Sequence, residues 1–417
     1  MSVAQSLSLV LLVVVLVLAI WRRMNIGVLA LAAALPVLAL SGLDAKEMYK
    51  AFPGDLFVLI AGVSLLFAHL ERSGALGFLV DRVYRAIGDR HALLPWAGFL
   101  IAGALSTAGA FSTAPIAFLV PIVAHMCVRS RSTFLLCELA VIIAANCAGL
   151  SPLNPTGAVV RSAASKLNVS YPQWGLWAVS VAVAFVVVAL LQVVTAIARR
   201  RGTPFEATPA PADTEQDEAA RNPWYMASCG IALLAFLLLV VLAKYDVGVT
   251  AMCLAVLLQI AFRPSERALL QRIPWQSILL LCGLLTYLGL MQKIGTIDSI
   301  AHILRHLGSG ALLILVLAYL TALLCNIESS TLGVLGLITP IAFGTFGHQG
   351  IAFWVAAAVC VPAALMVMNP IHVAGTLIIA NSTIDYQDIL FRRLLAIAVF
   401  LAIVVPGMLA IVPIALE

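Results

Sequence analysis

The sequence predicts an all-α polytopic membrane protein with about ten transmembrane helices and two re-entrant hairpins, arranged as two inverted repeats that each contain a broken helix. Three observations support this fold class. Of the 417 residues, 63% are apolar and only 10% are charged, against about 25% charged residues in soluble globular proteins. Long apolar runs recur along the whole chain, and the two halves carry the same motifs in the same order. This composition excludes an ordinary soluble enzyme, a nucleic-acid-binding protein and a disordered protein.

The apolar runs follow one another as consecutive membrane-spanning helices do. A transmembrane helix needs about 20 mainly apolar residues. The first run is followed by Trp21-Arg22-Arg23 and not by a small-residue cleavage site, so we expect a retained helix and not a signal peptide. The runs lie near residues 5–20, 25–41, 55–71, 93–107, 110–127, 133–149, 174–198, 224–243, 247–262, 275–292, 310–325, 331–347, 350–368 and 392–414.

Two pairs of runs are joined by links that are too short for two complete crossings. Residues 107–110 join the first pair and carry no charge, and residues 326–330 join the second. A re-entrant hairpin enters and leaves the membrane on one side, and its irregular tip is tolerated where protein or a wet cavity covers it. The sequence therefore predicts hairpins at about 93–127 and about 310–347.

The basic residues predict the orientation of these helices. With the loop that carries Arg22 and Arg23 placed in the cytoplasm, most of the 24 Lys and Arg residues fall on the cytoplasmic side. Both termini then lie on the non-cytoplasmic side. We expect a multi-pass protein of a bacterial-type inner (plasma) membrane, surrounded by lipid.

The two halves of the chain, 1–199 and 223–417, match one another across a polar segment at 200–222, which we interpret as a cytoplasmic linker. Each half holds five spans and one hairpin. Because five is odd, the second half is inverted relative to the first. The matched residues, at a constant offset of 221, are Pro53 and Pro274, Gly62 and Gly283, and Gly74 and Gly295.

Inverted repeats with broken helices are typical of secondary transporters, whose substrate sites lie near the membrane midplane. In each half, the segment after the third span is amphipathic, at 75–87 and at 296–308. Such segments are expected to lie in the plane of the membrane interface. A simple surface helix is the alternative.

An Asn-Pro pair interrupts one apolar run in each half. Asn154-Pro155 lies in a broken helix predicted at about 133–168, and Asn369-Pro370 in one predicted at about 350–381. A Pro inside a span removes a backbone hydrogen bond and breaks or kinks the helix. The half-helix that starts near Thr156 directs free N–H groups and its positive dipole end toward the midplane, which favours an anion. A kink without a ligand is the alternative.

Hydroxyl and amide side chains gather at both hairpin tips. Ser112 or Thr113 can cap the returning helix of the first hairpin, with Pro115 in its first turn. Oxygen donors of this kind bind Na⁺. The alternative is contact between helices, since Ser and Thr also join membrane helices. The residues predicted as Na⁺ ligands are Ser112, Thr113, Asn146, Asn326, Glu328, Ser329, Ser330 and Thr331.

Ionisable side chains inside a membrane are usually functional. Glu328, at the second tip, is predicted to ligate Na⁺, to carry a proton or to repel a competing anion, with a solvated acid as the alternative. His372 is predicted to donate a hydrogen bond to a substrate carboxylate, with a local backbone bond as the alternative. We expect Glu138 to face the cytoplasmic edge and Arg161 to reach the near interface.

The order of hairpins and broken helices resembles the ion transporter superfamily, and within it the divalent-anion:sodium symporters and the malonate-type dicarboxylate carriers. The closest local matches are Ser151-Pro152-Leu153-Asn154-Pro155-Thr156-Gly157 and Asn326-Ile327-Glu328-Ser329-Ser330-Thr331. The symporters carry a Ser-Asn-Thr motif at each tip, which binds Na⁺ and a substrate carboxylate together. The second tip keeps this Asn as Asn326, whereas the first has Ser106-Thr107 and departs from the motif. The resemblance implies a homodimer with an elevator movement, in which the hairpins and broken helices move and the amphipathic segments link them to a scaffold.

These patterns predict a secondary active transporter that couples Na⁺ to the symport of a small dicarboxylate, such as malonate or a C4-dicarboxylate, by elevator-type alternating access. The alternatives are an arsenite or Na⁺/H⁺ exchange carrier of the same superfamily and a proton-coupled organic anion carrier. We expect no enzyme activity, because no H-E-x-x-H, Ser-His or paired-Asp arrangement stands out in the spans. We expect no cofactor beyond Na⁺ or H⁺ as the coupling ion, and no nucleic-acid partner. The residues predicted to bind substrate are Ser106, Thr107, Ser151, Asn154, Pro155, Thr156, Gly157, Asn326, Asn369, Pro370, His372 and Gly375.

Overall fold

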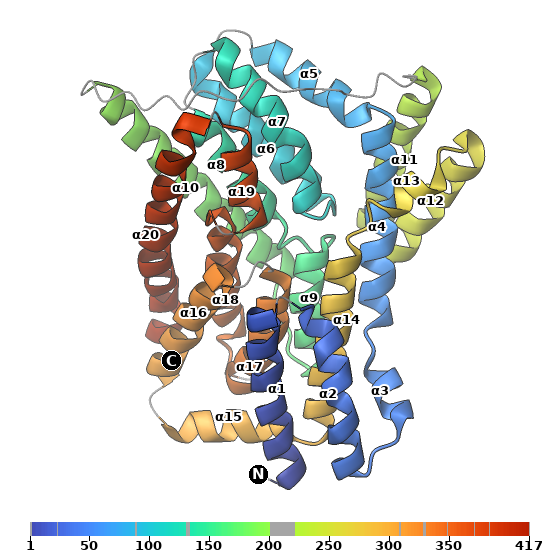
Figure 1. The fold of residues 1–417 in the computed structure, drawn as a ribbon, viewed down its shortest axis with the longest axis vertical. Helices are drawn as coiled ribbons and strands as arrows, with labels where there is room; N and C mark the ends of the chain where they lie inside the picture. Colours follow the sequence, from blue (N-terminus) through green and yellow to red (C-terminus); the bar gives the residue numbers. More distant parts are fainter. Residues whose placement is uncertain are drawn as a thin grey trace.

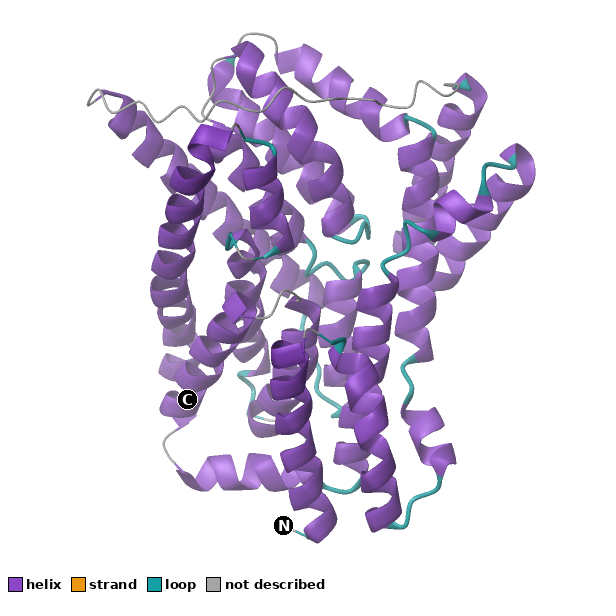
Figure 2. Cartoon of the chain, viewed as in Figure 1, coloured by secondary structure: helices purple, strands orange, loops and turns teal. Residues whose placement is uncertain are grey.

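The computed structural model describes residues 2–22, 24–87, 90–130, 134–200, 222–307, 310–327, 331–347, 349–370, 372–382 and 384–416. Nearly all of these residues are helical, as Figure 2 shows, which confirms the predicted all-α class. Most of the predicted linker, at 201–221, lies outside the described residues. So do Glu328, Ser329 and Ser330 of the second hairpin tip.

Capping side chains and glycines set the helix ends in the first half. The Asn25 side chain accepts hydrogen bonds from the N–H groups of Gly27 and Val28, which begins α2, and Gly42 ends α2 at φ +67°. The helices of this half are α1 (Val3–Arg22), α2 (Ile26–Ser41), α3 (Ala45–Ala51), α4 (Gly54–Arg72), α5 (Ala75–Ile87), η1 (His91–Leu93), α6 (Leu94–Thr107), α7 (Thr113–Ser130), α8 (Phe134–Ala148), α9 (Pro155–Lys166) and α10 (Gln173–Arg200).

The second half repeats this series of helices. Asp246, which corresponds to Asn25 at the offset of 221, caps α12 by accepting a hydrogen bond from the Val249 N–H at 2.9 Å. The helices are α11 (Pro223–Val241), α12 (Val247–Phe262), α13 (Glu266–Leu270), α14 (Trp275–Lys293), α15 (Thr296–Leu307), α16 (Gly310–Ile327), α17 (Thr331–Phe346), α18 (Ala352–Leu365), η2 (Met366–Met368), α19 (Val373–Ala380) and α20 (Ile384–Leu416).

Helices α4 and α14 occupy corresponding places in the two halves and run in opposite directions. In Figure 1, α4 leads from α3 upward to α5 at the top, whereas α14 leads from α13 downward to α15 at the bottom. Gly74 and Gly295 follow these helices, and each has a φ of +77°, which a residue with a side chain rarely adopts. The two predicted amphipathic segments form helices α5 and α15. They lie at opposite ends of the bundle.

Two glycine contacts join the halves. Gly27 of α2 lies so close to α14 that an added Cβ atom would come within 2.6 Å of the Leu280 Cα atom and would collide with the Leu279 carbonyl oxygen. Gly248 of α12 lies equally close to α4, where an added Cβ atom would come within 2.6 Å of the Leu59 Cα atom. Small residues allow membrane helices to approach to backbone contact.

Several helices have the length and surface of membrane spans. By length and apolar composition, five described helices can cross a membrane, at Gly54–Arg72, Gln173–Ala198, Pro223–Val241, Trp275–Lys293 and Tyr386–Leu416. Shorter apolar helices occupy the other predicted spans. Large apolar side chains such as Leu190, Leu234 and Phe400 are exposed on the long helices. An exposed apolar surface on such helices indicates contact with lipid.

Helix pairs α6–α7 and α16–α17 stand at the positions of the two predicted hairpins. Each predicted broken helix is divided as expected, into α8 and α9 in the first half and into α18 and α19 in the second. Helix α9 packs on α17, and α19 packs on α7. Each half-helix that follows a break thus contacts the returning helix of the opposite half's hairpin, so the four elements form one interlocked unit.

Candidate functional site

Asn154 joins the first break, which is the segment 149–154 between α8 and α9, to the tip of the first hairpin. Its Nδ2 group donates to the carbonyl oxygens of Ser106, at 2.9 Å, and Ala110, at 2.7 Å. Its Oδ1 atom accepts the Thr156 N–H at 3.0 Å, which begins α9. The Asn154 side chain is fully buried. Both of its donor hydrogens are therefore used inside the protein.

Ser151 adds a second connection between the same segments. Its Oγ atom donates to the Thr107 carbonyl oxygen at 2.8 Å and accepts the Leu153 N–H at 3.2 Å. Behind it, Gly157 packs against the Ser151 carbonyl oxygen so closely that a side chain would collide with it. A Gly is required here because the first turn of α9 touches the preceding loop.

The first turn of α9 has its backbone donors occupied. The Thr156 N–H donates to Asn154, the Gly157 N–H to the Gly149 carbonyl at 3.1 Å, and the Ala158 N–H to the Asn154 carbonyl at 2.9 Å. Pro155 has no N–H to offer. In this conformation, the predicted anion site near Thr156 has no free backbone donor among these residues.

Two asparagines join the second break, which lies between η2 and α19, to the second hairpin. The Nδ2 group of Asn369 donates to the Asn326 Oδ1 atom at 2.7 Å and to the Asn326 carbonyl oxygen at 3.2 Å. The Nδ2 group of Asn326 donates to the Ala322 carbonyl oxygen at 2.8 Å, within α16. Gly375 packs against the Asn369 carbonyl oxygen, as Gly157 packs against Ser151. Pro370, which follows Asn369 in the sequence, is also buried.

His372 differs from the asparagines because its ring has no partner. It is the N-cap residue of α19 and is 8% exposed. Among the residues that the structure describes, neither Nδ1 nor Nε2 has a hydrogen-bond partner. A buried polar group without a partner costs about 1–3 kcal/mol. This ring is therefore available to a ligand at the second break.

The predicted Na⁺ ligands that the structure describes lie in different places. Ser112 is buried beside the start of α7, whereas Thr113, the first residue of α7, is exposed. The Asn146 Nδ2 group donates to the Ile142 carbonyl oxygen within α8. Thr331 is the first residue of α17 and is half-buried. No group of three or more His, Cys, Asp or Glu side chains within the described ranges is placed to hold a metal ion.

Glu138 does not face the cytoplasmic edge, and this expectation was wrong. The side chain is 0% exposed, and neither carboxyl oxygen has a hydrogen-bond partner among the described residues. Helix α8 packs against α6, α7, α10 and α18, which encloses an acid one to two turns from its start. The only sequence signal for this site is a single acid in the apolar run 133–149.

Arg161, which we expected to reach the near interface, is half-buried and contacts the first break. Its Nη1 atom donates to the Pro152 carbonyl oxygen at 3.1 Å, so the side chain folds back onto the first break. The guanidinium satisfies a carbonyl that the break leaves without a helical partner.

An apolar cavity of about 440 Å³ lies beside the first hairpin. Trp177 of α10 lines it and donates its indole N–H to the Thr107 Oγ1 atom at 3.0 Å. The hydroxyl of Thr107, one of the predicted substrate ligands, thus accepts a bond from α10. This contact could not be predicted from local sequence, because residues 107 and 177 lie far apart in the chain.

Two comparisons place this arrangement among known proteins. A family model described as CitMHS, citrate transporter, matches residues 16–367. The crystal structure of the Alcanivorax borkumensis YdaH transporter, whose topology is described as unusual, matches with a TM-score of 0.58 at 15% sequence identity. This match covers 87% of the present chain and 86% of that chain, and it shows a shared fold. No curated protein matches the sequence.

Proposed function

The chain belongs to the CitMHS citrate transporter family, and from this membership we propose that it is a symporter that carries a small di- or tricarboxylate anion together with a cation. The membership and the shared fold confirm the resemblance to the ion transporter superfamily. The protein is accordingly a multi-pass membrane transporter. Citrate, malonate and C4-dicarboxylates are the substrates that we propose to test first.

The observation that carries this proposal is the unpartnered His372 ring at the second break. It lies three residues after Asn369, whose amide is bonded to the tip region of the second hairpin. A ring N–H can donate to a carboxylate, and such charge-assisted bonds are stronger than neutral ones. We propose that His372 holds one carboxylate group of the substrate at the N-terminal end of α19, where the helix dipole also favours an anion.

We propose that Asn154 and Asn369 each hold one hairpin against the neighbouring break. Asn154 bonds the first tip, and Asn369 bonds Asn326 of the second. Because hairpin and break then move together, the substrate and the two hairpins travel as one unit in an elevator-type movement. Helices α5 and α15, at opposite ends of the bundle, are the proposed links to a scaffold formed around the α2–α14 and α4–α12 contacts.

The corresponding helices of the two halves support the proposal of inverted repeats, 1–199 and 223–417, an architecture that many alternating-access transporters share. We further propose a homodimer in a bacterial-type inner membrane with both termini on the non-cytoplasmic side. These proposals rest on the charge distribution of the loops and on the superfamily resemblance.

The coupling cation is proposed to be Na⁺, held by oxygen donors at the second hairpin, including Asn326 and Thr331. The buried carboxyl of Glu138 favours a second candidate, proton coupling. An ionised carboxylate without a partner is costly to bury, and a bound proton or cation relieves that cost. The citrate transporter family favours a carboxylate substrate over arsenite or Na⁺/H⁺ exchange.

Competition for uptake in proteoliposomes tests the substrate class. Purified protein takes up labelled citrate, and unlabelled citrate, malonate, succinate, arsenite and sulfate are added in turn. We expect the carboxylates to reduce uptake of the label and arsenite and sulfate to have no effect. Inhibition by arsenite or sulfate alone contradicts the proposal.

A further inference from the structure

A small cavity lies between α4 and the first hairpin, with four polar side chains in a mainly apolar wall and no residue of either break among its described lining residues. Its volume is about 50 Å³, which is room for a few water molecules. Ser64 and Glu71 of α4, Thr113 and Pro115 of α7 and Arg272 of the loop before α14 all line it. The cavity therefore meets the hairpin tip on one side and an ion pair on the other.

The ion pair joins the two halves of the chain. The guanidinium of Arg272 contacts the Glu71 carboxylate, and the two side chains are 43% and 30% exposed. An ion pair that is this accessible to water is worth little to stability, about 0–1 kcal/mol. Its guanidinium can therefore exchange one carboxylate partner for another at small cost.

Three features of the cavity favour an anion. Arg272 presents a planar fork of donors that matches a carboxylate. Helix α7, which has 18 residues, begins at Thr113 in the cavity wall, so its positive dipole end faces this space. The Ser64 Oγ atom is buried, at 8% exposure, and has no hydrogen-bond partner among the described residues. Glu71 is the only acid among the lining residues, and it already contacts Arg272.

We propose that Arg272 captures a carboxylate group of the substrate at the mouth of this cavity by exchanging it for Glu71, and that the Arg272–Glu71 pair is a gate beside the first hairpin. The proposal rests on the proposed carboxylate transport. In this proposal the pair separates before the substrate passes the hairpin tip.

The test compares uptake kinetics of Arg272→Gln and Glu71→Gln in proteoliposomes with labelled citrate. Capture predicts opposite effects. Arg272→Gln removes the guanidinium and raises KM about tenfold or more, as the loss of a charge-assisted bond predicts. Glu71→Gln removes the competing carboxylate and lowers KM. Arg272→Lys keeps the charge without the fork and has an intermediate KM.

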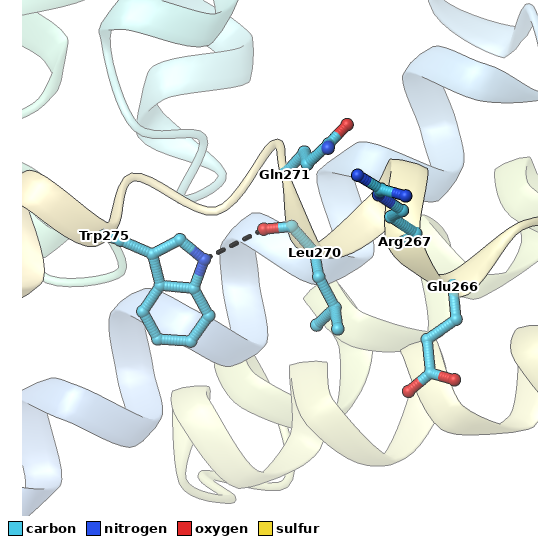
Figure 3. A pocket seen from close by; sticks show the side chains of 5 residues that line it. All are labelled: Glu266, Arg267, Leu270, Gln271 and Trp275. Atoms are coloured by element: carbon cyan, nitrogen blue, oxygen red, sulfur yellow. Dashed lines mark hydrogen bonds between the residues drawn. The ribbon is translucent and has the colours of Figure 1, made fainter.

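Arg267→Gln is the matched control. Arg267 is an exposed Arg only five residues away, in a separate open pocket of about 420 Å³ with Glu266, Leu270, Gln271 and Trp275 (Figure 3). We expect wild-type KM from this variant. Thermal unfolding of each purified variant shows whether it is folded.

Each outcome decides the proposal. A purely structural ion pair predicts that Arg272→Gln and Glu71→Gln change KM in the same direction, because both break the same pair, and this result overturns capture. An Arg272→Gln variant with the KM of Arg267→Gln also overturns it. If the wild-type protein itself takes up no carboxylate, the proposed function fails, which is a different result from failure of the gate.

Discussion

Gly27 of α2 and Gly283 of α14 pack at backbone contact: a side chain at Gly283 would collide with the backbone of Gly27, and a side chain at Gly27 would collide with the backbone of Leu279 and Leu280 on the same helix as Gly283. At the offset of 221, Gly27 corresponds to Gly248 and Gly62 to Gly283. Gly62 and Gly248 make the equivalent contact between α4 and α12. The two halves therefore hold each other through a reciprocal pair of contacts. One contact joins α2 of the first half to α14 of the second, and the other joins α4 of the first half to α12 of the second. Two helix pairs joined in this way are suited to a fixed scaffold.

Substitution of Gly283 by Ala is expected to destabilise the protein by about 1–3 kcal/mol, because the added methyl group meets backbone atoms that cannot move aside. The measurement is thermal unfolding of the purified protein in detergent. Gly230→Ala is the control, since nothing lies within 4 Å of a Cβ atom added at Gly230 of α11. Equal stability of the two variants would show that the α2–α14 contact is loose.

Asn154→Ala is expected to lower the thermal unfolding temperature, because it leaves the carbonyl oxygens of Ser106 and Ala110 without this donor inside the protein. Unsatisfied buried groups cost about 1–3 kcal/mol each. Asn381→Ala is the control, because the Asn381 Nδ2 group makes one bond, to the Leu377 carbonyl oxygen at the end of α19. A variant as stable as the control with a raised KM would make Asn154 a substrate ligand and not a clamp.

His372→Leu is expected to raise the KM for citrate about tenfold or more with little change in stability. Leu has a similar size, and no internal hydrogen bond is lost because the ring has no partner among the described residues. His372→Gln, which keeps a donor, is expected to recover part of the affinity. Uptake kinetics and thermal unfolding are measured on the same preparations. An unchanged KM for His372→Leu would remove His372 from the substrate site.

Glu138→Gln is expected to abolish cation-driven accumulation while substrate exchange across the membrane continues. Uptake is measured across pH at fixed Na⁺ and across Na⁺ at fixed pH. If Glu138 binds a proton, the variant loses its pH dependence, and if it binds Na⁺, the variant loses sodium affinity. Wild-type behaviour in both series would exclude Glu138 from coupling.

Glu47 of α3 is expected to make stability fall at acid pH. Hydrogen bonds from Lys293 and Lys50 hold the pKa of Glu47 below its ordinary value. The folded-state pKa is then lower than the unfolded-state pKa of about 4.3, so the stabilisation is present above the unfolded pKa and is lost as pH falls through the folded pKa. We expect the difference in unfolding temperature between wild type and Glu47→Gln to be constant above about pH 5 and to vanish in acid. A difference that persists in acid would have another origin.

The breaks and hairpins could be predicted from local sequence. Pro155 removes a backbone donor and cannot continue a helix from the preceding turn, so α8 had to end before it, and it ends at Ala148. The short link at 107–110 predicts that the helices on either side of it lie close together, and α6 and α7 do pack on one another. Both features depend on a few consecutive residues, which is why the sequence alone was sufficient to predict where α8 ends and that α6 and α7 are neighbours.

The partners of the site residues could not be predicted in the same way. Which carbonyl oxygens Asn154 bonds depends on how the first hairpin folds back onto α8, and Ser106 is 48 residues away in the chain. The burial of Glu138 depends on four helices that surround α8. The pattern around Arg161 gave no reason to expect a bond to Pro152, because the sequence does not show which carbonyl the break leaves free.

Accumulation of labelled citrate in proteoliposomes is the most direct test of the account. The interior is loaded without Na⁺ at one pH, and an inward Na⁺ gradient is imposed, with an inward proton gradient in a parallel series. We predict that wild-type protein concentrates the label above its external level under one of these gradients, and that an ionophore collapsing that gradient releases it. Label that only equilibrates, with no response to either gradient, would contradict coupled transport.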